Sequence, residues 1–289
     1  METSELLQKV RHIEIKARGL SRNIFAGEYH SAFKGRGMAF SEVREYQYGD
    51  DLRDIDWNVT ARYNRPYVKV FEEERELTVM LLIDVSESQS FGSTSIVKRD
   101  MVAQIAATLA FSAIQNNDKI GVIFFTDKIE KFIPPKKGRK HILFIIREIL
   151  GFTPGSLGTE IDQALRYMTN GIKKRCTAFL ISDFIDSHDY KHALRIANRK
   201  HDLVAIQVYD ALSTRLESVG LMKVHDPESD KDTWIDTSSK KTREQYRTWW
   251  TRRQAEMDVA FKQSRVDSVS VSTEDDYVKS LLQLFQQRR

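Results

Sequence analysis

The stretch TVMLLIDVSES at residues 78–88 decides the fold. Its first six residues, 78–83, form an apolar run of the kind found in strands that are buried on both faces. The run ends in Asp84-Val85-Ser86-Glu87-Ser88, so one carboxylate and two hydroxyls follow the strand on alternate residues. Such oxygen ligands suit a hard cation like Mg²⁺. An aspartate followed by serines is also common in turns and helix N-caps, so the spacing alone leaves both interpretations open.

Two further oxygen donors occur where other strands are expected to end. Thr159 follows the loop 153–158, and Asp183 comes directly after the apolar run 178–182. Because parallel strands of an open α/β sheet end at the same carboxyl edge, these donors are expected to converge there. The predicted metal ligands are Asp84, Ser86, Ser88, Thr159 and Asp183. We expect them in loops at the edge of the sheet, where substitutions leave the fold intact.

Strand-like and helix-like segments alternate after residue 76. Apolar runs predict strands at 78–83, 119–125, 129–133, 177–182, 203–208 and 266–271. Apolar residues three or four apart predict helices at 95–115, 138–150, 160–168, 188–200, 239–264 and 275–287. This alternation predicts an α/β fold with a doubly wound, mostly parallel sheet and right-handed crossovers.

Two segments do not follow the alternation. Residues 221–224 and 233–235 flank a polar turn and predict a hairpin, which could extend the sheet at one edge. The N-terminal region opens with an amphipathic helix near 6–17, becomes irregular, and ends in a strand at 67–71 that leads into the first core strand. We therefore expect two parts, an N-terminal region at 1–75 and an α/β domain at 76–289.

The five predicted ligands resemble, in type and order, the metal-ion-dependent adhesion site of von Willebrand factor A (vWA) domains. The resemblance implies a vWA-like domain that holds Mg²⁺ or Mn²⁺ and keeps one coordination position open for a carboxylate from a partner protein. Two positions depart from the pattern. Phe184 stands where adhesion-type vWA domains commonly have glycine, and the threonine loop has the single glycine Gly158 instead of two.

The segments 35–40, 43–46, 49–57 and 61–62 resemble the signature of a bacterial family called domain of unknown function 58, in which it precedes a vWA-like domain. Members are commonly encoded beside MoxR-type AAA+ ATPases. The resemblance therefore implies a partner of that type, or its client, and an adaptor or co-chaperone role. We interpret the signature itself as a clasp that holds the N-terminal region to the core, with a partner-binding surface as the alternative.

Carboxylates are also dense within this signature. A second cation site is conceivable, but the glycine and terminal glutamate of a calcium loop are missing. Turns and helix caps between Arg44, Arg53 and Arg62 are the better interpretation. The residues concerned are Asp50, Asp51, Asp54 and Asp56.

Composition and charge exclude several classes of protein. The 289 residues include 45 basic and 41 acidic ones, with no arm or block of one sign, so no nucleic-acid partner is expected. The single cysteine, Cys176, fits a small core residue in a reducing compartment. The N-terminus has neither the basic start nor the apolar stretch of a secretory signal, and no apolar run is long enough to cross a bilayer. We expect a cytoplasmic protein without direct membrane insertion.

The sequence lacks the motifs of several enzyme classes, and this disfavours catalysis. Ser86 stands where a haloacid-dehalogenase-type phosphatase has its second aspartate, and phosphate-binding and nucleophile-elbow motifs are missing from the sequence. None of the seven histidines lies within the three ligand loops, so no general base accompanies the metal. A non-catalytic binding protein is the better interpretation, and a metal-dependent hydrolase or nuclease using the same cation is the alternative.

Three other groups have ordinary explanations. His188 and His192 are four residues apart, as in a zinc pair, but a solvated helix face is favoured. The basic run 136–140 is expected to be a solvated loop. Core or interdomain packing is expected of a set at approximately helical spacing, Trp249, Trp250, Met257 and Phe261.

Overall fold

The computed structural model describes residues 3–21, 39–72, 77–86, 97–156, 158–226 and 231–288. The chain divides into two compact units, a smaller one at Lys34–Glu76 and a larger one that combines Met1–Phe33 with Leu77–Arg289. This division differs from the expected one, because the N-terminal helix α1 (Thr3–Leu20) packs within the larger unit and not with the family signature.

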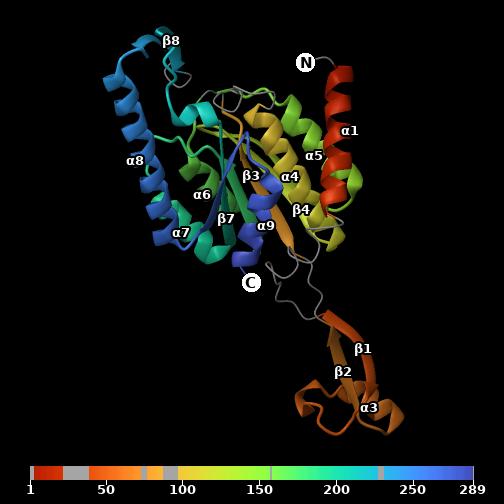
Figure 1. Ribbon diagram of the computed structural model, residues 1–289. Coiled ribbons are helices and arrows are strands. Elements are labelled where there is room, and N and C mark those ends of the chain that lie inside the picture. The colour runs from red at the N-terminus through yellow and green to blue at the C-terminus, as the bar shows by residue number, and fades with distance from the viewer. Residues whose placement is uncertain are drawn as a thin grey trace. The chain divides into compact units, whose positions relative to one another are not determined.

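A six-stranded sheet forms the centre of the larger unit (Figure 1). Its strand order is β10-β7-β6-β3-β4-β5, and every neighbouring pair is parallel except β4 with β5. The strands are β3 (Thr78–Asp84), β4 (Lys119–Phe125), β5 (Ile129–Lys136), β6 (Thr177–Ser182), β7 (Asp202–Tyr209) and β10 (Asp267–Ser272). The predicted α/β fold with a mostly parallel sheet is confirmed.

Helices cover both faces of this sheet, as Figure 1 shows. They are α4 (Lys98–Gln115), α5 (Arg139–Gly151), α6 (Ile161–Gly171), α7 (Lys191–Lys200), α8 (Lys240–Ser264) and α9 (Tyr277–Gln287). Helices α1, α4, α5 and α9 pack in one apolar cluster, and α6, α7 and α8 pack in the other. Alternate residues of β3 explain the two clusters, because Leu81 and Ile83 belong to the first and Leu82 to the second.

Helix α1 is held to the larger unit by both apolar and charged contacts. Val10, Ile13 and Ala17, spaced three and four residues apart, are buried on one face. Lys9 Nζ lies 3.0 Å from Asp100 of α4. Glu14 accepts a 2.6 Å hydrogen bond from Arg139, which opens α5 within the basic run 136–140. That basic run is thus partly structural.

The predicted hairpin forms β8 (Leu221–Asp226) and β9 (Lys231–Asp236). It is a separate two-stranded antiparallel sheet and does not extend the central one, contrary to the expectation. The reason is that β10 pairs with β7 and so occupies that edge of the central sheet.

The smaller unit contains β1 (Ala39–Glu45), a short 3-10 helix η2 (Leu52–Asp54), α3 (Trp57–Tyr63) and β2 (Tyr67–Glu72). Strands β1 and β2 form an antiparallel pair, so the predicted strand at 67–71 pairs within this unit. The expected caps are confirmed, because Asp51 accepts from Arg53 N and Asp56 accepts from Asn58 N and Val59 N. The clasp to the core stays a prediction.

An irregularity lies at the β4–β5 edge of the sheet. Ile120 pairs with Lys136 and Val122 with Ile133, so Gly121 alone stands opposite Pro134 and Pro135. A Cβ on Gly121 would lie 2.9 Å from Pro135 N, too close for a side chain. Within the described ranges, no helix has the length and apolarity needed to cross a membrane.

Candidate metal site at the carboxyl edge of the sheet

Asp84 is the last residue of β3, and its neighbour strand β6 ends at Ser182. The parallel register pairs Ile83 with Ile181, which brings the next residue of each strand side by side. The Ser182 hydroxyl donates a 2.6 Å hydrogen bond to Asp84 Oδ2. The two strand ends are therefore joined at the point that the sequence predicts for the site.

Asp84 is buried, with 2% of its surface exposed. Its second oxygen, Oδ1, accepts a 3.0 Å hydrogen bond from the backbone N–H of Ser86, which is buried as well. Burial and the negative charge of Asp183 raise the pKa of Asp84 to about 6, although hydrogen bonds from Ser182 and Ser86 oppose this increase. The two aspartates therefore lie close enough for their charges to interact.

Asp183 is also buried and is paired with a lysine that the sequence analysis missed. Lys98 Nζ lies 2.9 Å from Asp183 Oδ2, and the two side chains are only 5% and 2% exposed. The other oxygen of Asp183, Oδ1, accepts a 3.1 Å hydrogen bond from Ile185 N. Lys98 was detectable in principle, because it continues the apolar stripe of Met101, Val102 and Ile105 at helical spacing. A lysine in such a stripe needs a buried partner.

The chain turns after Asp183 at Phe184, the position where the resemblance to vWA domains implies glycine. Its φ is 58°, in the left-handed region that costs an ordinary residue about 1–2 kcal/mol. The Phe184 N–H donates to Ser182 Oγ at 2.9 Å. The ring is buried and meets Phe261 of α8 edge-on at 5.0 Å between centroids. Packing of the ring thus offsets the strain of the turn.

Thr159 lies just before α6 and is buried. Its loop is attached on both sides of β3, since Glu160 N donates to Thr126 O after β4 and Ile161 N donates to Asp186 Oδ2 after β6. Because β3 lies between β4 and β6, this loop passes the edge where Asp84 is placed. Of the predicted ligands, Ser88 lies outside the described residues.

The donors that are described fit a hard divalent cation. They comprise two carboxylates and two hydroxyls, and oxygen ligands of these kinds are the ones that such a cation prefers. The described ranges hold no cluster of three or more His, Cys, Asp or Glu side chains placed for a metal. All four described candidates are buried, although they stand at the edge of the sheet as expected.

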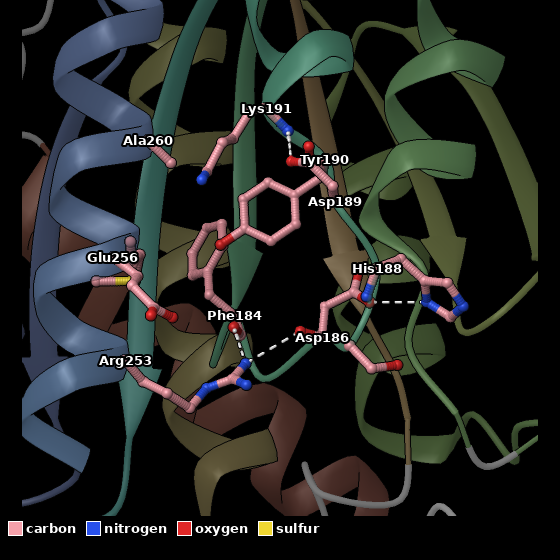
Figure 2. A pocket seen from close by; sticks show the side chains of 11 residues that line it. Phe184, Asp186, His188, Asp189, Tyr190, Lys191, Arg253, Glu256 and Ala260 are labelled. Atoms are coloured by element: carbon pink, nitrogen blue, oxygen red, sulfur yellow. Dashed lines mark hydrogen bonds and ion pairs between the residues drawn. The ribbon is translucent and has the colours of Figure 1, made fainter. Parts of the chain in front are cut away.

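A cavity of about 420 Å³ adjoins the loop that carries Asp183 (Figure 2). It is lined by that loop and by α8, with both acidic and basic side chains in its wall. Arg253 of α8 donates to the carbonyl oxygens of Phe184 at 3.1 Å and Asp186 at 3.2 Å. Arg253 therefore fixes the backbone of the loop from the cavity side.

The other candidate groups serve the fold. His188 precedes α7, not on its face as expected, and its Nδ1 lies 2.9 Å from Asp186 Oδ1 (Figure 2). Cys176 is buried as predicted, and burial raises the pKa of its thiol to about 12. Met257 and Phe261 are core residues, but Trp249 is 41% exposed and only partly fits the predicted packing.

Comparison with known proteins places the chain in a family. The family described as "Protein of unknown function DUF58" matches residues 42–256. The chain belongs to the DUF58 family. This DUF58 protein is 28% identical over 231 residues to the uncharacterised protein Rv1480 of Mycobacterium tuberculosis, which covers 79% of this chain and 73% of the relative. It is 27% identical over 109 residues to the uncharacterised protein YeaD of Bacillus subtilis, or 38% of this chain and 25% of the relative.

Two solved structures illustrate what this DUF58 chain is similar to. BatB from Bacteroides thetaiotaomicron is 14% identical with a TM-score of 0.47, over 73% of this chain and 98% of that one. The VWA domain of SpRpn10 is 13% identical with a TM-score of 0.40, over 73% of this chain and 95% of that one. Likenesses at this level carry no conclusion about function.

Proposed function

We propose that this DUF58 chain is a metal-dependent protein–protein interaction module that binds a partner's carboxylate through Mg²⁺ or Mn²⁺. The proposed ligands are Asp84, Ser86, Ser88, Thr159 and Asp183. One observation carries the proposal: two interacting buried aspartates lie at adjacent strand ends, the Ser182 hydroxyl donates to Asp84, and Ser86 lies on the same turn as Asp84. The order of the donors, which resembles the adhesion site of vWA domains, supports it independently.

Each residue has a distinct part in this mechanism. Asp84 and Asp183 supply the negative charge, and Ser182 orients Asp84 by donating to Oδ2. Ser86 and Thr159 contribute neutral oxygens, so the ligand set carries few formal charges. When bound, a divalent cation supplies an electrophilic centre for a carboxylate from outside the chain. Burial of the ligands keeps water from screening this attraction.

A binding role is favoured over catalysis by the neighbourhood of the site. The closest histidine along the chain, His188, is engaged with Asp186 in the adjoining loop. The carboxyl of Asp186 also accepts from Ile161 N, so it positions the Thr159 loop. These groups therefore have structural tasks, which supports a site that holds a partner without transforming it.

The proposed partner is a MoxR-type AAA+ ATPase or its client, for which the chain would act as adaptor or co-chaperone. This part rests on the resemblance of the family signature to proteins encoded beside such ATPases. The proposed setting is the cytoplasm, and the single buried thiol of Cys176 agrees with a reducing compartment.

The test is retention of the chain by an immobilised MoxR-type ATPase. We expect retention with Mg²⁺ that is lost in EDTA and in the variant Ser86→Ala/Ser88→Ala. Lys136→Gln/Lys140→Gln is the matched control, because it changes surface charge away from the ligands and should alter only the salt dependence. Retention that survives EDTA and the serine variant, but not the control substitutions, would show that the binding face lies elsewhere.

A further inference from the structure

Lys98 is an unusual residue for its position. It is the first residue of α4, and only 5% of its side chain is exposed. Lysines are almost never fully buried unless paired, because removing an ammonium from water costs several kcal/mol. Its ion pair joins helix α4 to the segment after β6, 85 residues away in the chain. Such a contact calls for an explanation beyond the ordinary packing of the helix.

The partner of Lys98 is one of the proposed metal ligands. The ammonium lies 2.9 Å from Asp183 Oδ2, so it places a positive charge directly against this carboxylate. A divalent cation that Asp183 ligated would share this carboxylate with the ammonium. Two positive charges at one carboxylate repel each other, and the repulsion is stronger where water is excluded. The ammonium and the cation therefore compete for the same carboxylate.

We propose that Lys98 is the resident cation of this site in the metal-free protein, and that a divalent ion binds by displacing the Lys98 ammonium from Asp183. This inference rests on the metal site of the proposed function and adds a residue that sets its affinity and selectivity. A monovalent ion that replaces the ammonium brings no additional charge, whereas Mg²⁺ or Mn²⁺ does. Lys98 thus disfavours Na⁺ and K⁺ and keeps the affinity for divalent ions low.

The chain offers a matched control for Lys98. Lys9 makes an ion pair with Asp100 at 3.0 Å, with Asp100 on the first turn of the same helix α4. This pair is partly exposed and involves none of the proposed ligands. Removing the Lys9 ammonium therefore changes the charge near α4 without changing the pairing of Asp183.

The first experiment is calorimetric titration of Mn²⁺ into the full chain and its variants. Lys98→Met should bind Mn²⁺ at least tenfold more tightly than wild type, whereas Lys98→Arg and Lys9→Met should remain within twofold of it. Binding by Lys98→Met alone would also support the displacement, because it would show that the lysine blocks the site. Unchanged or weaker binding by Lys98→Met, with wild type binding normally, would overturn the displacement and leave the metal site standing. No binding by any form would overturn both.

Two measurements keep the inference testable if Lys98→Met folds poorly. In thermal unfolding, saturating Mn²⁺ should raise the Tm of Lys98→Met more than that of wild type, because tighter binding stabilises the folded state more. An equal or smaller increase would contradict the displacement. In wild type, the NMR signal of the protected Lys98 ammonium should be lost on adding Mg²⁺, and a signal that persists at saturation would overturn the proposal.

Discussion

Two groups of aspartates have contrasting surroundings: Asp50, Asp51, Asp54 and Asp56 in the smaller unit, and Asp84 and Asp183 in the larger unit. In the smaller unit, Asp50 lies within 2.8 Å of two nitrogens of Arg44, and this pairing lowers the pKa of Asp50. In the larger unit, burial and Asp183 raise the pKa of Asp84. The sequence has more carboxylates in the first group, but only the second is buried at the meeting point of strand ends.

The difference shows that the number of carboxylates does not identify a site. Asp51 and Asp56 satisfy backbone N–H groups at the starts of η2 and α3, and so they complete local structure. Asp84 and Asp183 instead accumulate negative charge where water is excluded, and the described structure compensates part of it with Lys98. Negative charge at low exposure is the property that favours cation binding.

The strongest test of this contrast is the stability of Asp183→Asn. The substitution leaves the Lys98 ammonium buried without its counter-charge, so the free energy of unfolding should fall by about 3–5 kcal/mol. Urea unfolding followed by circular dichroism measures the change. The double variant Lys98→Met/Asp183→Asn should recover part of the loss, and equal stability of wild type and Asp183→Asn would contradict a buried ion pair.

The second test is metal binding by Asp84→Asn. The amide keeps the size of the side chain and removes its charge, so the affinity for Mn²⁺ should fall at least about 100-fold, or about 2.7 kcal/mol. Isothermal calorimetry provides the measurement. Asp51→Asn in the smaller unit is the control and should bind like wild type, and equal loss in both variants would remove the distinction between the two groups.

The pH dependence of stability sharpens the contrast further. The pKa of Asp84 is about 6 in the folded protein and ordinarily 3.8, so between these values the folded state binds more protons than the unfolded one. The free energy of unfolding should therefore decrease as pH rises from about 4 to 6, by about 2 kcal/mol from this group. The measurement is the difference between wild type and Asp84→Asn in EDTA. A difference that does not vary with pH would count against the raised pKa.

The smallest expected effect is in the smaller unit. Asp56→Ala removes the cap from α3, so local stability should fall by about 1 kcal/mol. Hydrogen exchange of the amides of Asn58 and Val59 should accelerate about fivefold, because these two donors lose their acceptor. The carboxylates of the larger unit should be unaffected, and Mn²⁺ binding by Asp56→Ala should match wild type.

The central fold was predictable because its signals are local. Strands that are buried on both faces, such as β3 and β6, require continuous apolar runs, and the helices between them carry apolar residues at helical spacing. Long-range choices were not predictable in the same way. The pattern of apolar residues does not specify that β10 pairs with β7 at the edge of the sheet. Because β10 occupies that edge, β8 and β9 form a separate hairpin. Nor does the pattern specify that α1 packs on α4 and α5.

The candidate site was predictable only in part. Asp84 and Asp183 could be placed because each directly follows an apolar strand, and parallel pairing then brings them together. The hydrogen bond from Ser182 depends on side-chain direction at the end of β6, which has no sequence signature. Lys98 was missed because a charged residue at the start of a helix is ordinarily solvated, and the apolar stripe that it continues does not identify its buried partner.

The two prolines of β5 make this edge of the sheet a poor template for pairing with another chain. An edge strand with free N–H groups is a template on which another chain can extend the sheet. Pro134 and Pro135 have no N–H to offer, and the irregular register opposite Gly121 interrupts the ladder of β5. Strand-by-strand aggregation is thereby disfavoured at this edge, and Gly121→Val, which would collide with the backbone of Pro135, should increase self-association in light scattering.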